Sequence, residues 1–240
     1  MTPHDKIQYA KHNMAGLLGI QSDAFDLPHN LYAKHASMVF WMTTFGGNAV
    51  IVGREDVIDW ASAQFGCMPP EDLLDTDSTY AINTFLRQRG YKLSSQDIRH
   101  LHLHPHIEVA QPKGISVKRF AGDELASFVR DFPANSAFKE SLNDCDSDAL
   151  LYAAFDGDTA ISIACGRSDK GMWAIGPVDT LPQHRGNGIG RFLVKELTKE
   201  LEKSGNIVYY TTWSANMAST RLALGAGFRP AWLGNYAVSV

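Results

Sequence analysis

The sequence predicts an α+β protein with a mixed β-sheet, in which a C-terminal domain at residues 113–240 follows a smaller α+β domain at residues 1–112. Three observations support this prediction. Short apolar, β-rich runs alternate with segments of helical periodicity along the chain. Residues 110–114 have the composition of a connection between domains. A strand, a glycine-rich loop and an amphipathic helix follow one another at residues 173–203.

Length and composition limit the class of protein. The 240 residues are 45% hydrophobic and 20% charged, which is ordinary for a globular protein. A net charge of −4 argues against a general nucleic-acid binder. Cys67, Cys145 and Cys165 are scattered and form no C-x-x-C pair, so neither a disulfide framework nor a zinc knuckle is indicated. Without a signal peptide or a bilayer-spanning run, we expect a cytoplasmic protein that binds no membrane.

The N-terminal part has clear elements but no motif with evident chemistry. Its predicted elements are helices at residues 7–18, 55–65 and 77–90, and strands at residues 38–45 and 49–52. The turn Gly46-Gly47-Asn48 joins the two strands in a hairpin. Asp77 and Ser78 can cap the third helix, and Gly90 is a plausible residue just beyond its end. We expect this part to pack on the rest and to help shape a substrate cleft.

A run of histidines follows, at His100, His102, His104 and His106. In a strand, alternate residues share one face, and imidazole is a common ligand of transition metals. However, alternate residues of a strand lie about 6.5–7 Å apart at their Cα atoms, and no acidic or cysteine partner has a diagnostic spacing. The sequence therefore favours an edge strand that leads into the next domain over a metal site, with a protonation-sensitive patch as an open alternative.

The C-terminal part has a regular order of elements. Its predicted strands lie at residues 115–120, 150–155, 159–167, 173–178, 207–212 and 231–240, and its predicted helices begin at Gly122, 137, 189 and 216. The helix at residues 189–203 has one apolar face and one charged face. The last helix closes at Gly227-Phe228.

The loop at residues 181–190 indicates a phosphate site. Glycine lets the backbone approach a ligand closely, and the start of a helix offers unpaired N–H groups and a positive dipole end. A P-loop would need lysine where Phe192 stands, and a dinucleotide loop would need glycine at Arg191 or Leu193. The pattern R-x-x-G-x-G fits, with Arg185, Gly188 and Gly190. A glycine-rich turn without any ligand is the alternative.

Together with Asn216, Ser219 and the closing Gly227-Phe228, this loop resembles that of the GNAT superfamily of acyl-CoA N-acyltransferases over residues 115–240. The resemblance implies a GNAT fold whose strands before and after the loop helix splay apart to admit acetyl-CoA. The N-terminal domain matches no motif, and a degenerate partner domain is one alternative.

The resemblance also implies a set of cosubstrate contacts. The backbone of Val178, Asp179 and Thr180 would pair with the pantetheine arm, and Asn216 and Ser219 would contact the same arm. The pyrophosphate would be held by the loop: Arg185, Gly186, Asn187, Gly188, Ile189 and Gly190. Acetyl-CoA is the only cosubstrate expected, with no metal.

The expected reaction is attack of a neutral amine on a thioester, which needs a base, an oxyanion donor and an acid for the leaving thiolate. Many family members place a tyrosine acid seven residues after the asparagine, but Ala223 stands there. We therefore expect catalytic roles for Ser219, as acid, and Asp179, as base. His184, a water chain and an N-terminal carboxylate are alternative bases.

Three tyrosines, Tyr209, Tyr210 and Tyr236, are less well placed to act as the acid. Ala223 also leaves open a second function, a non-catalytic acyl-CoA-binding regulatory module. The acceptor is expected to be a small-molecule or peptide amine, bound partly by the helices near residues 123–142. A homodimer is an open alternative to a monomer.

Overall fold

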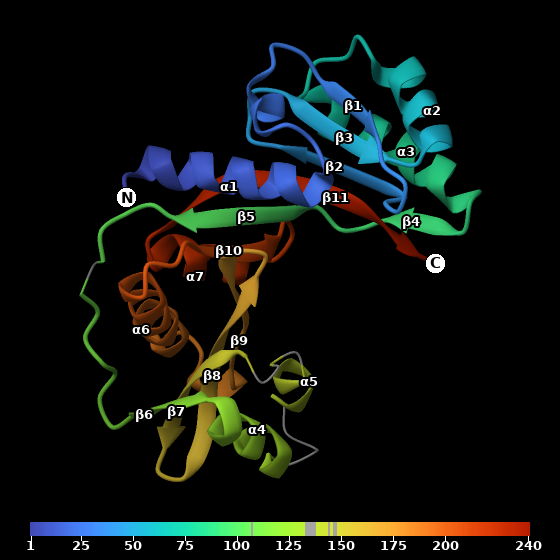
Figure 1. Ribbon diagram of the computed structural model, residues 1–240. Helices are drawn as coiled ribbons and strands as arrows, with labels where there is room; N and C mark the ends of the chain where they lie inside the picture. Colours follow the sequence, from blue (N-terminus) through green and yellow to red (C-terminus); the bar gives the residue numbers. More distant parts are fainter. Residues whose placement is uncertain (107, 133–137, 144, 146–147) are drawn as a thin grey trace. The chain divides into compact units, whose positions relative to one another are not determined.

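The computed structural model describes residues 1–106, 108–132, 138–143, 145 and 148–240 (Figure 1). Contacts divide the chain into two compact units. The first unit comprises Met1–Arg99, Thr212–Ala215 and Pro230–Val240. The second unit comprises His100–Thr211 and Asn216–Arg229. Strand β5 (Asp97–His102) begins in the first unit and ends in the second.

The first unit is a small sheet with helices. Its helices are α1 (Pro3–Leu18), α2 (Glu55–Phe65) and α3 (Thr76–Arg87), and its strands are β1 (Leu31–Lys34), β2 (Phe40–Thr44), β3 (Ala49–Gly53), β4 (Tyr91–Leu93) and most of β11 (Phe228–Ser239). Strand β1 pairs with β3 in parallel, and β2 lies antiparallel between β3 and β11. The predicted hairpin and the helices at residues 7–18 and 55–65 are therefore confirmed.

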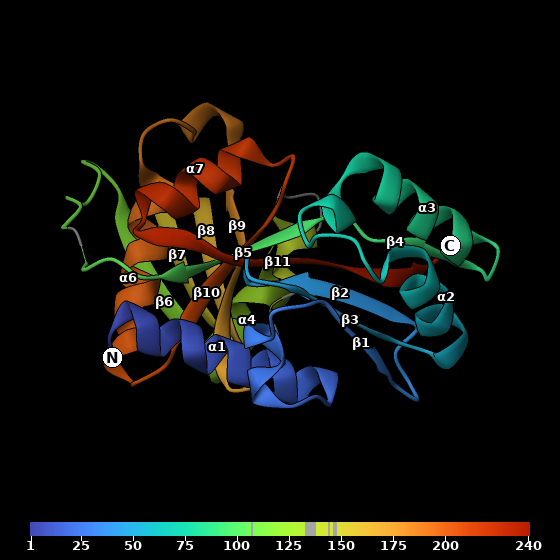
Figure 2. The same cartoon turned by 90° about the horizontal axis from the view of Figure 1, so that it is seen from above.

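Helices α2 and α3 cover β2 and β3, and Figure 2 shows them beside these strands. The apolar face predicted for α2 is buried, because Val57, Ile58 and Phe65 all point into this core. The predicted cap of α3 is wrong. Asp75, rather than Asp77 or Ser78, precedes the helix, and its side chain accepts the N–H of Ser78 at 2.7 Å. A capping side chain lies three residues before the N–H that it accepts, whereas Asp77 lies within the first turn.

The second unit is a twisted sheet in the order β10-β9-β8-β7-β6. Its strands are β6 (Ser116–Ala121), β7 (Leu150–Asp156), β8 (Thr159–Asp169), β9 (Met172–Thr180) and β10 (Val208–Trp213, as far as Thr211), and its helices are α4 (Gly122–Asp131), α5 (Lys139–Leu142), α6 (Ile189–Lys203) and α7 (Met217–Gly225). Strands β6 to β9 are antiparallel neighbours, while β9 and β10 are parallel. The start of the helix predicted from residue 137 lies outside the described residues.

Both faces of this sheet are covered by helices. Side chains alternate along β7, so Leu150 and Ala154 pack with α6 and α7, whereas Leu151 and Phe155 pack with α4 and α5. Helix α6 buries the apolar face that its sequence predicts, including Leu193 and other residues at helical spacing. The predicted mixed α/β sheet is thus confirmed.

The compact units do not divide the chain at residues 112 and 113. The last strand, β11, pairs with β2 and β4 through residues that belong to the first unit, and the second unit already begins at His100. The domain boundary expected between residues 112 and 113 stays a prediction. Among the described residues, no helix combines the length and apolar character needed to cross a membrane.

Candidate functional site

The site begins where β9 leaves β10. The parallel pairing of these strands runs from Trp173 with Val208 to Ile175 with Tyr210, and then ends. On its other side, β9 stays paired with β8 as far as Thr180. Among the described strands, the edge of β9 beyond Ile175 therefore opens on the β10 side. An extended ligand could add its backbone-like groups to this edge, as peptides do to sheet edges.

An irregularity in β9 marks this opening. Between the pairs Gly166–Ile175 and Ala164–Val178, β9 contains one residue more than β8. The extra residue is accommodated at Gly176 and Pro177, and proline has no N–H to offer a neighbouring strand. Bulges of this kind bend a strand and change the direction of its side chains, and they recur beside active sites.

The end of β9 is held by side-chain hydrogen bonds. Ser162 donates from Oγ to the carbonyl of Asp179 at 2.9 Å, and lies 2.7 Å from the hydroxyl of Thr180. The N–H of Thr180 donates to Oδ1 of Asp179 at 2.7 Å. The predicted contact residues Val178, Asp179 and Thr180 therefore lie on one fixed, open edge. Their contact with a cosubstrate stays a prediction.

Arg185 fastens the loop to this strand. Its Nε donates to the carbonyl of Thr180 at 2.8 Å, and its Nη2 lies 3.4 Å from Oδ1 of Asp179. The side chain of Arg185 nevertheless stays 62% exposed, so its charge is accessible to an anion. The predicted base Asp179 is thus engaged by loop contacts through Oδ1. His184, the alternative base, lies in the short turn Pro182–His184, and its carbonyl accepts the side-chain N–H of Asn187.

The loop glycines adopt conformations that other residues avoid. Gly186 has φ +81° and Gly188 has φ +75°, both in the left-handed region. Gly188 is also the N-cap residue of α6 and supplies no side-chain cap. The N–H of Phe192 donates to the carbonyl of Gly188, so the N–H groups of Ile189 to Arg191 precede the first intrahelical hydrogen bond, which is the usual arrangement for binding phosphate at a helix start.

Gly190 allows close packing at the start of α6. A Cβ atom there would lie 3.2 Å from Cδ1 of Leu222 and 3.3 Å from Oγ1 of Thr180. Because Gly190 has no side chain, the start of α6 can lie against both α7 and the end of β9. The close approach of a ligand to Gly190 stays a prediction.

Ser219 lies in hydrogen-bond contact with Tyr210, one of the three tyrosines that the sequence made less favoured candidates for the acid. Asn216 is the N-cap of α7, and its side chain accepts the N–H of Ser219 at 3.1 Å. The hydroxyl of Ser219 donates to the hydroxyl of Tyr210 at 3.0 Å. Tyr210 is the last residue of β10 that pairs with β9, so this hydroxyl pair stands at the opening. In the sequence, the position of Tyr210 near the end of the strand that follows the loop helix could have indicated that it lies at this opening.

The environment of Tyr210 keeps its proton in place. Its side chain is almost completely buried, and burial raises the pKa of its phenol, although the hydrogen bond from Ser219 acts in the opposite direction. A neutral phenol at the splay can donate a proton or a hydrogen bond. Ala223, at the position of the common tyrosine acid, is buried in the core shared with α6.

The two other tyrosines are not brought to Ser219. Tyr209 donates its hydroxyl to Asp169. Tyr236 lies in the first unit and stacks on Trp41 at 5.0 Å between ring centroids. The structure therefore distinguishes Tyr210 from its neighbour in sequence, which alternation along a strand requires.

The histidine run is divided among different surroundings. His100 and His102 lie in β5, which has a strand on each side in the sheet order and so is not an edge strand. His102 and His106 both contact the carboxylate of Glu202, in the last turn of α6. The acidic partner that the sequence did not reveal is therefore supplied by a helix 100 residues away.

A separate groove of about 1070 Å³ lies on the face of the sheet covered by α4. Its apolar wall is formed by Phe120, Phe128, Phe132 and Phe155. Glu124, Asp131 and Asp158 add carboxylates, and Lys118 and Arg119 add positive charges. Such a combination suits an apolar ligand that carries polar or charged groups.

Residues 119–228 match the model of the acetyltransferase (GNAT) family. No curated protein matches the chain. Similar solved structures include a putative GNAT-family acetyltransferase from Novosphingobium aromaticivorans, 17% identical, with a TM-score of 0.43 over 62% of this chain and 66% of that one. A GCN5-related N-acetyltransferase from Kribbella flavida is 18% identical, with a TM-score of 0.44 over 65% and 62%.

A tandem GNAT protein from the clavulanic acid biosynthesis pathway is 16% identical, with a TM-score of 0.45 over 65% of this chain and 57% of that one. The chain thus spans less than two thirds of the length of these three structures. The family match covers the elements from β6 to the start of β11, including the splay, the loop and α7. Residues 119–228 are thus the part of the chain that the model of the acetyltransferase (GNAT) family identifies as a GNAT domain.

Proposed function

We propose that this protein transfers an acetyl group from acetyl-CoA to a primary amine by direct attack within a ternary complex. The observation that carries the proposal is the departure of β9 from β10 directly before the loop of Arg185 and Gly188. An extended arm can lie along the opened edge, while its phosphate end reaches the start of α6. Both features belong to the second unit and to the residues matched by the family.

In this proposal, the cosubstrate is bound mainly by backbone groups. Val178, Asp179 and Thr180 pair with the pantetheine amides, and the N–H groups of the loop hold the pyrophosphate. Arg185 adds charge while it keeps the loop attached to β9. Asn216 and Ser219 face the same arm from the start of α7.

The leaving thiolate takes its proton from Tyr210, and Ser219 orients the phenol through their hydrogen bond. The role requires a neutral phenol, and burial keeps Tyr210 in that form, although the raised pKa also makes it a weaker acid. Asp179 is the proposed base for the acceptor amine. Because the N–H of Thr180 and the side chain of Arg185 both contact Oδ1, we assign this function to Oδ2.

The acceptor is proposed to enter from the face covered by α4. The groove there combines aromatic side chains with three carboxylates and two cationic side chains, so an apolar group can lie on the rings while an amine pairs with a carboxylate. Phe128 and Asp131 are its proposed contacts on α4.

A second function is a regulatory module that binds acyl-CoA without turnover. Ala223 favours it, because the usual position of the acid is taken by a small, buried packing residue. The two functions share the cosubstrate site. They differ in whether Tyr210 and Ser219 take over the role of the tyrosine acid whose position is occupied by Ala223.

Thermal unfolding with acetyl-CoA, together with thiol release in the presence of a panel of amines, tests both functions. Ligand at 100 times its Kd stabilises the folded state by about 2.7 kcal/mol. Stabilisation with thiol release supports the enzyme, and stabilisation without acetyl transfer to any amine supports the regulatory module. The absence of any shift refutes both.

A further inference from the structure

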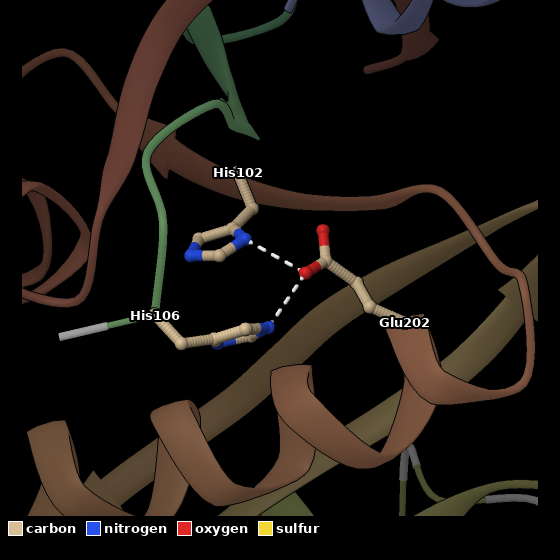
Figure 3. A group of neighbouring side chains, drawn as sticks. All are labelled: His102, His106 and Glu202. Carbon is tan, nitrogen blue, oxygen red and sulfur yellow. Dashed lines mark hydrogen bonds and ion pairs between the residues drawn. The ribbon is translucent and has the colours of Figure 1, made fainter. Parts of the chain in front are cut away.

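We propose that His102, His106 and Glu202 form a binding site for one divalent transition-metal ion of the zinc type. The three side chains come from the end of β5, from the segment that follows it and from the last turn of α6 (Figure 3). All three lie in the second unit. The site is separate from the splay and the loop, so the proposal does not depend on acetyl transfer.

The ligand atoms already converge. Nδ1 of His102 lies 3.0 Å from Oε2 of Glu202, and Nε2 of His106 lies 2.8 Å from the same oxygen. The two imidazole rings are 4.7 Å apart at their centroids, and one ligand atom from each residue lies within 4.8 Å of the others. Ligands of tetrahedral zinc, with bonds of about 2.0–2.1 Å, are about 3.3 Å apart. The two N–O separations are therefore about 0.3–0.5 Å shorter than this spacing, and side-chain rotations that widen them make room for the ion.

The charge around Glu202 favours a cation. Glu202 stands in the last turn of α6, where the helix dipole is negative and a carboxylate is unfavourable. A metal ion held there interacts favourably with both the carboxylate and the helix end. Two neutral imidazoles and one carboxylate form a typical donor set for zinc, and imidazole disfavours magnesium and calcium.

His102, the most buried of the three ligands, is held in place by its packing neighbours. His102 is only 2% exposed, and its ring packs 5.2 Å from that of Phe228. Gly227 has φ +99°, and a Cβ atom there would lie 2.9 Å from Nε2 of His102. The histidine ring thus occupies space that a residue with a side chain would take. A ligand fixed in this way loses little freedom when the ion binds.

The third ligand provides access from solvent. The side chain of His106 is 36% exposed, against 16% for Glu202. His106 also lines a groove of about 470 Å³. The charged side chains of this groove are Glu108, Glu196, Lys195 and Lys199. Because these charges balance, the groove does not repel a cation, and water from it can complete the coordination.

Zinc and cobalt titrations of the full chain, first treated with a chelator, test this proposal. We expect one Zn²⁺ per chain by calorimetry, and Co²⁺ should give the strong visible bands of four-coordinate cobalt. Zinc at 100 times its Kd should raise Tm by about 5–10 °C. His106→Ala and Glu202→Gln should each weaken binding by more than the roughly 10- to 100-fold that loss of an outer-shell partner costs.

The matched control is His104→Ala, an exposed histidine of the same segment outside the cluster. It should bind zinc with wild-type affinity. Wild-type protein that shows neither the Tm shift nor the cobalt bands overturns the proposal. Equal losses of affinity in His104→Ala and His106→Ala also overturn it, since they would indicate scattered binding to surface histidines. None of these readouts depends on acetyl-CoA, so failure here is distinguishable from failure of the proposed function.

Discussion

Replacing Tyr210 by phenylalanine removes only the hydroxyl that Ser219 contacts at 3.0 Å, and leaves the buried ring in place. If this phenol protonates the leaving thiolate, kcat should fall by about 10²- to 10⁴-fold, the usual contribution of a general acid. At 1.36 kcal/mol per tenfold, this is a loss of about 3–5 kcal/mol of transition-state stabilisation. KM for acetyl-CoA should change little, because the proton is needed only as the thiolate forms.

The cost to folding should be much smaller. Loss of one hydrogen bond between neutral groups lowers the free energy of unfolding by about 0.5–1.5 kcal/mol. In a chain of this size, this corresponds to a decrease in Tm of roughly 1–6 °C. A measurement of thiol release well below Tm therefore separates the catalytic effect from the structural one.

Tyr209→Phe is the matched control. It removes a hydroxyl from the adjacent residue of the same strand, whose partner is Asp169 rather than Ser219. It should lower Tm by a similar or larger amount and leave kcat within about twofold of wild type. The proton-donor role of Tyr210 is refuted if Tyr210→Phe retains more than about a third of wild-type kcat, or if Tyr209→Phe loses as much activity.

Three further predictions concern other sites. Arg185→Ala should raise the Kd of acetyl-CoA, measured by calorimetry, about 3- to 10-fold, which is a modest effect because the guanidinium is exposed. Arg167, in β8, is also exposed, and Arg167→Ala should leave this Kd almost unchanged; equal effects of the two variants would exclude a local role for Arg185. Gly227→Ala should lower the free energy of unfolding, measured in urea, by about 2–4 kcal/mol, because the new Cβ would clash with His102. Gly205→Ala, where φ is +81° but the space is open, should lower it by only about 1–2 kcal/mol, and equal losses would contradict a clash with His102. Burial and the carboxylate of Glu200 raise the pKa of Tyr152 above its ordinary value of 10, so the stability that Tyr152 contributes is present below about pH 10 and is lost as the pH rises further. Between pH 9 and pH 11, the free energy of unfolding of a Tyr152→Phe variant should therefore fall less than that of wild type, and identical profiles would count against this.

Local patterns were sufficient to predict most elements. The helix over Ile189–Lys203 was predicted with closely similar bounds, because its apolar positions recur at helical spacing and glycines stand on both sides. Helix Glu55–Phe65 was predicted equally well, for the same reason. The cap of α3 was misplaced by two residues, since Asp75 and Asp77 are equivalent in composition and only backbone geometry distinguishes them.

The candidate site was predictable in part. The loop of Arg185 to Gly190 was found because phosphate-binding loops depend on glycine at fixed positions within one segment. The hydroxyl pair of Tyr210 and Ser219 was not, because it joins a strand to the following helix. Which of two adjacent tyrosines faces Ser219 depends on the register of β10, and a shift by one residue exchanges the two faces.

By itself, the sequence determined the resemblance to the GNAT family, the order of elements in the C-terminal part and the position of the glycine-rich loop, all of which depend on residues close together in the chain. The tertiary structure decided which distant side chains meet. It placed Glu202 against His102 and His106, and it placed the last strand, β11, in the first unit. Such contacts arise from packing and strand pairing between distant parts of the chain, 100 residues apart for His102 and Glu202, where composition and periodicity carry no information about the partner.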